Sequence, residues 1–207
     1  MKKLLFRIAG ILAALSMPLA INGAAHAVVD TCTWTGVGPD DNFSTAANWT
    51  GCDNGTVPES GDSLTFSVAS ATPNNDLVGA SFAVITITSP TVVSGNDFTL
   101  AGNIAVSGGV SRIENNLTLG SSVAVTGDGT LDIGASGLNT LNLGANNLTN
   151  STGSAMLRIY SVVSGSGTIS QNNTQSLFLF ADNSAYTGAI NVQQGTLWGK
   201  HVNALST

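Results

Sequence analysis

The chain has 207 residues, a formal net charge of −6, and 9% charged against 43% hydrophobic residues. Disordered chains combine low hydrophobicity with high charge, so this composition excludes a tail or linker and predicts a buried core. Three of the six Lys and Arg residues lie in the first seven positions, so the rest of the chain is strongly acidic and a nucleic-acid-binding surface is disfavoured. Only His201 and no group of cysteines follows residue 52, which disfavours most metal sites and histidine-based catalysis.

The N-terminal segment has the composition of a secretory signal peptide. Its features are the basic residues Lys2, Lys3 and Arg7, a mostly apolar stretch over residues 8–20, and the closing tripeptide Ala25-His26-Ala27. Signal peptidase accepts small residues at these last positions, so we expect export through the Sec pathway and cleavage after Ala27. The alternative is an uncleaved membrane anchor, but Pro18 and Asn22 interrupt an apolar run that would otherwise barely reach the ~20 residues of a span.

The rest of the chain consists of short apolar runs separated by Gly, Asn, Asp and Ser, which is typical of an all-β fold. In chain order, the predicted strands cover residues 64–68, 82–88, 98–100, 104–106, 117–119, 123–125, 131–133, 141–143, 157–163, 177–180, 190–192 and 196–198. A β-sandwich would give similar spacing, but its strands usually run longer and its loops carry more charge and proline.

Three of these strands repeat one small pattern, in which two apolar residues flank a polar residue and a glycine follows. They are Leu117-Thr-Leu-Gly120, Leu131-Asp-Ile-Gly134 and Leu141-Asn-Leu-Gly144. Such repetition predicts a right-handed parallel β-helix, or β-solenoid, whose inward residues stack into an apolar column while glycine opens each corner. The frequent Asn residues could adopt left-handed backbone angles and form ladders between coils, or could simply fill solvent-facing turns.

Two segments resemble a known family. The first comprises Gly165-Ser-Gly-Thr-Ile-Ser170, the run from Leu177 to Tyr186-Thr-Gly188, and Ile190-Asn-Val-Gln-Gln-Gly-Thr-Leu197. It resembles the autotransporter-associated β-strand repeat, in which an apolar strand leads to an Asn-rich corner, a Tyr-Thr-Gly turn, a second strand and a Gly-Thr-Leu strand. The second segment, with Trp34, Phe43 to Trp49, Pro58 to Asp62 and Leu64-Thr-Phe66, resembles the N-terminal region that often opens such proteins. The resemblance implies a passenger-type secreted β-helix in a cell-surface setting.

Cys32 and Cys52 are the only cysteines of a chain that we expect to be secreted, so we predict a disulfide between them. Closing a loop of about 20 residues would stabilise this region by roughly 3 kcal/mol in the chain-entropy model. A metal site is the alternative, but it lacks two further soft ligands nearby. We therefore predict a disulfide-pinned N-terminal cap over residues 28–75, followed by β-solenoid repeats over residues 76–207.

Several residues could carry chemistry in the cap. The acidic residues Asp40, Asp41, Asp53, Glu59 and Asp62 could supply carboxylates for sugar hydrolysis or for calcium, although most stand in turn contexts where Asp bonds its own backbone. The stretch from Gly127 to Asp132 is similar to calcium-binding nonapeptides, but its spacing differs by one residue and it is not repeated in tandem. The indoles of Trp34, Trp49 and Trp198 could stack on sugar rings or fill a core.

These observations predict an exported, non-catalytic module that acts as a cell-surface stalk or adhesin, with no metal and no cofactor. The ligand would be a surface glycan or a protein, and contact with the membrane would be limited to export. One alternative is a carbohydrate-active β-helix enzyme that uses the acids of the cap. Another is a glycan-binding module whose ligand meets Trp34, Trp49, Asp40 and Asp41 in the cap.

The family pattern breaks off at residues 203–207, where a further strand is expected. The last coil of a solenoid presents unpaired backbone groups and an apolar cross-section unless a polar cap covers it. We therefore expect the repeats to be incomplete at the C-terminus, or the C-terminal coil to associate with another copy or a partner.

Overall fold

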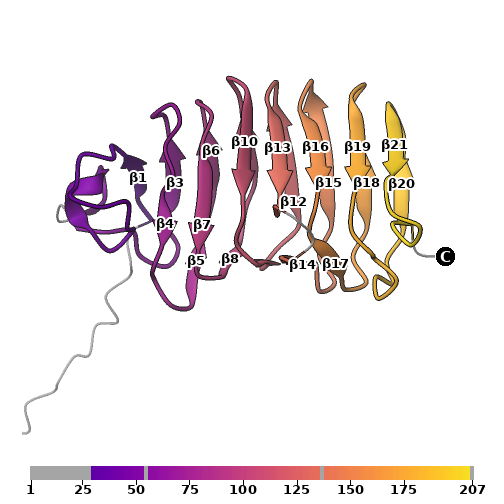
Figure 1. The fold of residues 1–207 in the computed structure, drawn as a ribbon, viewed down its shortest axis with the longest axis horizontal. Coiled ribbons are helices and arrows are strands. Elements are labelled where there is room, and N and C mark those ends of the chain that lie inside the picture. Colours follow the sequence, from indigo (N-terminus) through magenta and orange to yellow (C-terminus); the bar gives the residue numbers. More distant parts are fainter. Residues whose placement is uncertain (1–28, 54–55, 136–137, 206–207) are drawn as a thin grey trace, which may run out of the picture.

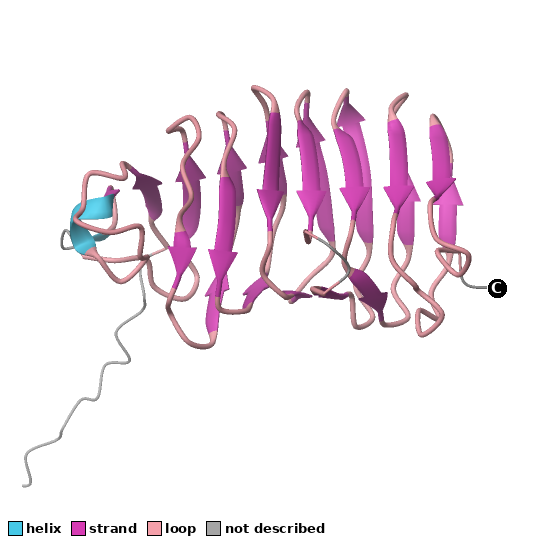
Figure 2. Cartoon of the chain, viewed as in Figure 1, coloured by secondary structure: helices cyan, strands magenta, loops and turns pink. Residues whose placement is uncertain are grey.

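The computed structural model describes residues 29–53, 56–135 and 138–205, which form a rod of stacked β-coils (Figure 1). The expected signal peptide and its cleavage site lie outside these residues. The only helix that lies wholly within them is the three-residue 3-10 helix η1 (Ala46–Asn48), and almost all other regular structure is strand (Figure 2). No helix in these ranges is long and apolar enough to cross a membrane.

The strands form three sheets along the rod. The nine-stranded sheet contains, in spatial order, β2 (Trp49–Thr50), β1 (Thr31–Trp34), β3 (Ser63–Phe66), β6 (Ile85–Ile87), β9 (Ile104–Val106), β12 (Val123–Gly127), β15 (Leu148–Gly153), β18 (Ile169–Gln171) and β20 (Ile190–Val192). The seven-stranded sheet contains β4 (Asn74–Asn75), β7 (Val92–Gly95), β10 (Val110–Ile113), β13 (Thr130–Ile133), β16 (Met156–Ile159), β19 (Ser176–Leu179) and β21 (Thr196–Gly199). The five-stranded sheet contains β5 (Ala80–Phe82), β8 (Phe98–Leu100), β11 (Leu117–Leu119), β14 (Thr140–Asn142) and β17 (Val162–Ser164).

The pairing of these strands confirms the predicted parallel β-solenoid, with about six turns. Within the described residues every strand pair is parallel except the antiparallel pair of β1 and β2. In the nine-stranded sheet Leu64 pairs with Ile85, and Ile85 pairs with Ile104, so one coil takes about 20 residues. The strands β3 and β4, which precede residue 76, are already members of the solenoid sheets.

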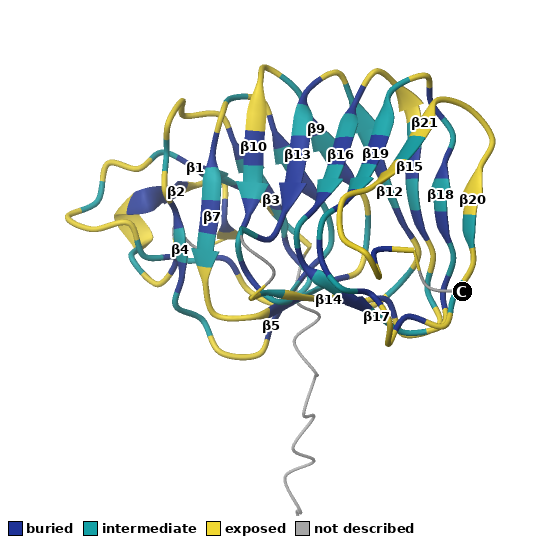
Figure 3. Cartoon of the chain, turned by 45° about the vertical axis from the view of Figure 1, so that its right-hand side comes forward, coloured by how far each residue is buried: buried dark blue, intermediate teal, exposed yellow. Residues whose placement is uncertain are grey.

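The core is a single apolar column between the three sheets. Buried residues alternate with partly exposed ones along most strands, as the dark blue and teal bands of Figure 3 show. In β3, for example, Leu64 and Phe66 point inward, whereas Thr65 lies on the outer face. The same alternation along each strand buries one apolar residue above another from coil to coil.

Asparagine side chains hydrogen-bond to the backbone of neighbouring coils. The Asn103 Oδ1 atom accepts the backbone N–H of Ala124 at 2.9 Å, and Asn147 Oδ1 accepts that of Thr168 at 2.8 Å. The expected left-handed backbone at Asn is wrong for the described residues, because none of their Asn residues has a positive φ. Glycine takes these positions instead. At Gly127, with φ of 109°, a Cβ atom would lie 2.0 Å from the carbonyl oxygen of the previous coil.

Two predicted strands are each divided in the structure. The run 157–163 turns at buried Ser161, whose hydroxyl donates to the Ile133 carbonyl, and this turn separates β16 from β17. The run 82–88 is likewise divided between β5 and β6. Among the strands that were not predicted, β15 and β18 carry polar residues on their inward side. The amides of Asn150 and Gln171 are buried there and hydrogen-bond to one another at 2.8 Å.

Candidate functional site

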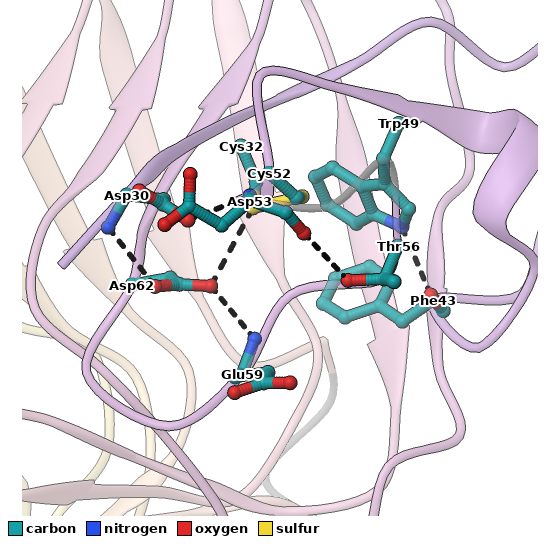
Figure 4. Close-up of a disulfide and its surroundings, with 9 residues drawn as sticks. All are labelled: Asp30, Cys32, Phe43, Trp49, Cys52, Asp53, Thr56, Glu59 and Asp62. Carbon is teal, nitrogen blue, oxygen red and sulfur yellow. Dashed lines mark hydrogen bonds between the residues drawn. A yellow bond between two sulfur atoms is a disulfide. The ribbon is translucent and has the colours of Figure 1, made fainter. Parts of the chain in front are cut away.

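The N-terminal end of the core is closed by an aromatic cluster. Trp34 of β1 and Trp49 of β2 meet edge to face with ring centroids 5.0 Å apart, and Phe43 approaches Trp49 at the same distance. All three rings are buried, and the Trp49 Nε1–H donates to the Phe43 carbonyl at 2.9 Å (Figure 4). The rings cover Phe66, which belongs to the next layer of the core. The structure therefore brings both predicted indoles together in the interior, and neither is exposed to meet a ligand.

A disulfide joins Cys32 of β1 to Cys52, which follows β2, and confirms the predicted pairing (Figure 4). Both cysteines are buried. Because β2 runs antiparallel to β1, the bridge fixes the chain where it folds back over the end of the solenoid. The disulfide and the aromatic cluster thus form one structural unit within the predicted cap.

The acidic residues near the disulfide accept hydrogen bonds from the backbone. Asp62 is only 4% exposed, and its carboxylate accepts the N–H groups of Asp30 at 3.1 Å and Glu59 at 2.8 Å (Figure 4). The Asp30 carboxylate in turn accepts the N–H of Asp53 at 2.6 Å. These bonds hold the turns around the disulfide, and they engage both Asp62 oxygens.

Asp40 and Asp41 are exposed on the loop before Phe43. Asp40 Oδ1 accepts the Thr45 hydroxyl at 2.7 Å and the Asn42 N–H at 3.0 Å, and these bonds, led by that of Thr45, lower the pKa of the Asp40 carboxyl. Asp41 accepts the hydroxyl of Thr72 at 3.3 Å. In the described parts of the chain, no three His, Cys, Asp or Glu side chains are grouped so that they could hold a metal ion.

A shallow groove of about 470 Å³ lies beside β5 and β8, and Val78, Asn96, Asp97 and Phe98 line part of it. Its one carboxylate, that of Asp97, accepts the Asn116 side-chain amide at 2.8 Å. The groove therefore offers one acidic group, the Asp97 carboxylate, which is already bonded to Asn116 of the next coil.

The outer face of the seven-stranded sheet carries a ladder of charges. Asp132 of β13 stands in register between Arg112 of β10 and Arg158 of β16, and its side chain is fully buried by them. Arg158 donates Nε to Asp132 Oδ1 at 2.6 Å and Nη2 to Oδ2 at 2.9 Å, whereas Arg112 Nη2 lies 3.5 Å from Oδ2. Arg112 also pairs with Glu114 at 3.1 Å, and this hydrogen bond raises the pKa of the guanidinium. The two cations and two carboxylates balance, and Asp132 is committed to arginine rather than to calcium.

The same outer face continues toward the C-terminal end with aromatic rings. Phe178 of β19 follows Arg158 in register, and Trp198 of β21 follows Phe178. Tyr160 and Phe180 form a second stacked pair beside this row, with ring centroids 4.2 Å apart. We call these four residues the aromatic strip.

Of the aromatic strip, only Trp198 is among the candidate residues predicted from the sequence. A signal was present in Leu177-Phe178-Leu179-Phe180, where the leucines point inward and the phenylalanines alternate with them on the outside. Repeats of about 20 residues then place Phe180 beside Tyr160.

Comparisons with known proteins identify no relative. No family model matches the chain, and no curated protein or solved structure matches it. Its function therefore has to be inferred from the fold and from the chemistry of its surfaces.

Proposed function

We propose that the chain is an exported, non-catalytic module of the passenger type, which acts as a stalk or adhesin at a cell surface. The observation that carries this proposal is the continuous rod of parallel coils, whose cap and last coil lie at opposite ends (Figure 1). A rod of this kind holds outward side chains at a regular spacing of about 4.8 Å per coil. It can present a ligand-binding surface at a distance from its point of attachment.

Export is supported by two independent features. The segment 1–27 has the order of basic, apolar and small residues that signal peptidase recognises. The Cys32–Cys52 disulfide is typical of an oxidising compartment outside the cytosol.

Membership of the autotransporter-associated repeat family is supported by the role of its Tyr-Thr-Gly turn. Tyr186 is buried, and its hydroxyl lies 2.6 Å from the Gly167 carbonyl and 2.8 Å from that of Ala189. The backbone of Thr187 donates to Gly165 of the preceding coil. The turn thus fastens one coil to the next, which is a function that each repeat of such a protein would need.

The proposal is tested by expressing the chain with its own N-terminus and analysing the exported fraction by mass spectrometry. The expected result is a mature chain that begins at Val28. The matched control is Ala27→Phe, which places a large residue before the bond and should block cleavage. Intact Met1 in a membrane fraction would overturn the proposal.

The enzyme alternative makes a different prediction on a panel of polysaccharides. Hydrolysis that disappears in Asp40→Asn or Asp62→Asn would favour a carbohydrate-active enzyme over a stalk. The geometry gives this alternative no specific support, because the Asp62 carboxylate is already bonded to two backbone N–H groups.

We further propose that two copies associate through their C-terminal coils. The strands β20 and β21 are the terminal members of their sheets, so each has one edge without a partner strand in the described chain. Val192 is 44% exposed, whereas Gln171, its register partner one coil earlier, is fully buried. The opposite end of the rod is closed by the cap, so a second copy would meet this edge with its own C-terminal coil.

A further inference from the structure

The aromatic strip is the one place where the described chain exposes aromatic rings. Seven other aromatic residues are described, and every one of them is buried: Trp34, Phe43, Trp49, Phe66, Phe82, Phe98 and Tyr186. Tyr160, Phe178 and Phe180 are partly exposed, and Trp198 is 47% exposed. A cluster of exposed rings on one sheet face is the signature of an interaction surface.

The rings share one orientation. The planes of Tyr160 and Phe180 differ by 7°, those of Phe178 and Trp198 by 11°, and those of Phe178 and Phe180 by 21°. Phe178 and Trp198 lie within strands, and Tyr160 and Phe180 directly follow strands, so the solenoid positions the backbone of all four rings. Preorganised aromatic side chains lose little conformational entropy on binding.

A cation stands beside these rings. The Lys200 Nζ atom lies 4.8 Å from the ring centroid of Trp198 and 5.6 Å from that of Phe178. Lys200 forms no ion pair within the described residues, whereas Arg112 and Arg158 both do. The strip therefore combines an apolar surface with the hydrogen-bond donors of Lys200 and the phenol of Tyr160.

We propose that the aromatic strip binds an uncharged polysaccharide. A sugar ring presents C–H groups on its faces and hydroxyl groups around its edge. Because Phe178 stacks on one face of Trp198 and β21 is the last strand of its sheet, the sugar can pack on the other face of Trp198 while it bonds to donors beside it. The inference deepens the proposed adhesin function, on which it rests, by assigning a ligand class and a face of the rod.

Two other ligand classes fit the surface less well. A polyanion would meet 12 acidic and 3 basic residues beyond residue 28, and the two arginines of this face are already neutralised by Asp132 and Glu114. A stable protein partner buries about 800 Å² on each side. Four partly exposed rings of about 150–250 Å² each offer less than half that area, which suits a narrow polymer better.

The first test uses tryptophan fluorescence of the full exported chain. Trp34 and Trp49 are buried, so quenching by acrylamide reports mainly on Trp198. Cellohexaose or mannohexaose should protect this indole from the quencher. Absence of protection by both oligosaccharides, at concentrations up to their solubility, would count against the strip as their site.

The second test is affinity electrophoresis in gels that contain hydroxyethyl cellulose, galactomannan or alginate. Retardation by at least one of the two neutral polymers is expected, with affinity at least tenfold lower in Phe178→Ser and in Trp198→Ala. Trp198→Ala changes an exposed side chain at the end of the strip, so it keeps the test valid if Phe178→Ser impairs folding. The matched control is Val78→Ser, because Val78 is 92% exposed away from the strip.

Several results would overturn the inference. They are no retardation by either neutral polymer, equal retardation of the strip variants and the wild type, retardation by alginate alone, and stable capture of a protein through the strip without any glycan binding. These assays use purified, folded chain. A failure of the proposed function as an exported adhesin would instead be seen in the export experiment, as an unprocessed chain retained in a membrane fraction. The two failures are therefore distinguishable.

Discussion

The two ends of the described rod differ in how far their apolar core is covered. At the N-terminal end Phe43 and the two tryptophans of the cap cover the first layer of the core, and β2 turns back antiparallel along the sheet edge. At the C-terminal end Val192 and Leu205 are 44% and 45% exposed, and no aromatic cluster covers the last strands within the part of the chain that the structure describes (Figure 3). The interior coils between them repeat one pattern.

A repeated strand pattern can add coils to a solenoid, but it does not cover the apolar cross-section of the last coil. Ending it requires side chains that the repeat does not contain, here large aromatic rings and a disulfide. Each coil contacts mainly its neighbours, so stability should be local and should differ between the two ends. The following experiments test that difference.

The largest effect should come from Phe43→Ala in the cap. Phe43 is fully buried and its ring contacts Trp34, Trp49 and Phe66, so its removal leaves a cavity that should cost about 3–5 kcal/mol of unfolding free energy. Urea unfolding followed by circular dichroism measures this loss. The comparison variant is Trp198→Ala at the other end, for which we expect less than about 1 kcal/mol. Equal losses at both ends would contradict the asymmetry.

Removing the disulfide should have the next largest effect. Cys52→Ser opens a loop of about 20 residues and should cost roughly 3 kcal/mol in the chain-entropy model. Amide hydrogen exchange should show faster exchange in β1 and β2 and little change in β19.

The double variant Cys32→Ser/Cys52→Ser is the control for the free thiol that the single variant leaves. Thiol titration of the unfolded, unreduced wild type should find no free cysteine. A uniform increase in exchange along the rod would show that the bridge acts on the whole solenoid rather than on the cap.

A smaller, pH-dependent effect should separate the distal coils from the cap. Burial raises the pKa of the Tyr186 phenol above its ordinary value of 10.0. The neutral phenol is therefore favoured in the folded state, and its contribution to stability is present below pH 10 and lost as pH rises toward the raised pKa.

Tyr186→Phe tests this expectation. The variant should lose about 1 kcal/mol at neutral pH through its missing hydrogen bond, but should become less sensitive to alkali than the wild type. Thermal unfolding between pH 8 and pH 11 measures both effects. Tyr160→Phe, on the outer face, provides the matched control. An identical alkaline loss in the wild type and Tyr186→Phe would mean that another group is responsible.

The smallest effect on stability, but a clear effect on association, is expected for Leu197→Lys. Leu197 faces the core in the last coil and is only partly buried, whereas its register partner Leu177 is fully buried. A charge there should weaken association of C-terminal coils, and sedimentation at increasing concentration would detect this. Thr196→Lys adds the same charge at an exposed neighbouring position and should change association less. A wild type that stays monomeric at high concentration would exclude the proposed dimer.

The solenoid and the disulfide could be predicted because both depend on patterns that are visible in one dimension. Alternating residues such as those of Leu117-Thr-Leu119 give the inward column, and a chain with two cysteines leaves one intramolecular pairing. The divided run 157–163 could not be predicted, because Ser161 ends β16 through a bond to the previous coil. Inward Gln171 was missed for a similar reason, since its side-chain oxygen accepts the amide of Asn150 in the previous coil.

The candidate surfaces were harder to predict than the fold. Trp49 and Trp198 are chemically identical in the sequence, yet one is buried in the cap and the other lies on the outer face. Whether a ring is covered depends on which residues lie one coil away. Phe178 joins Trp198 only through the register of β19 and β21, which a search for apolar runs does not contain.

The direction of the hydrogen bonds between coils determines how the rod responds to tension. The strands run across the rod, so the bonds that join β15 to β18 and β18 to β20 lie along its length (Figure 1). A pull on the two ends would pass through every coil in series, so the coils would open one after another rather than all together. Opening would start away from the cap, because the Cys32–Cys52 bridge prevents the loop that it closes from extending. Each opened coil of about 20 residues would release about 70 Å of chain, so the rod would lengthen in steps under tension.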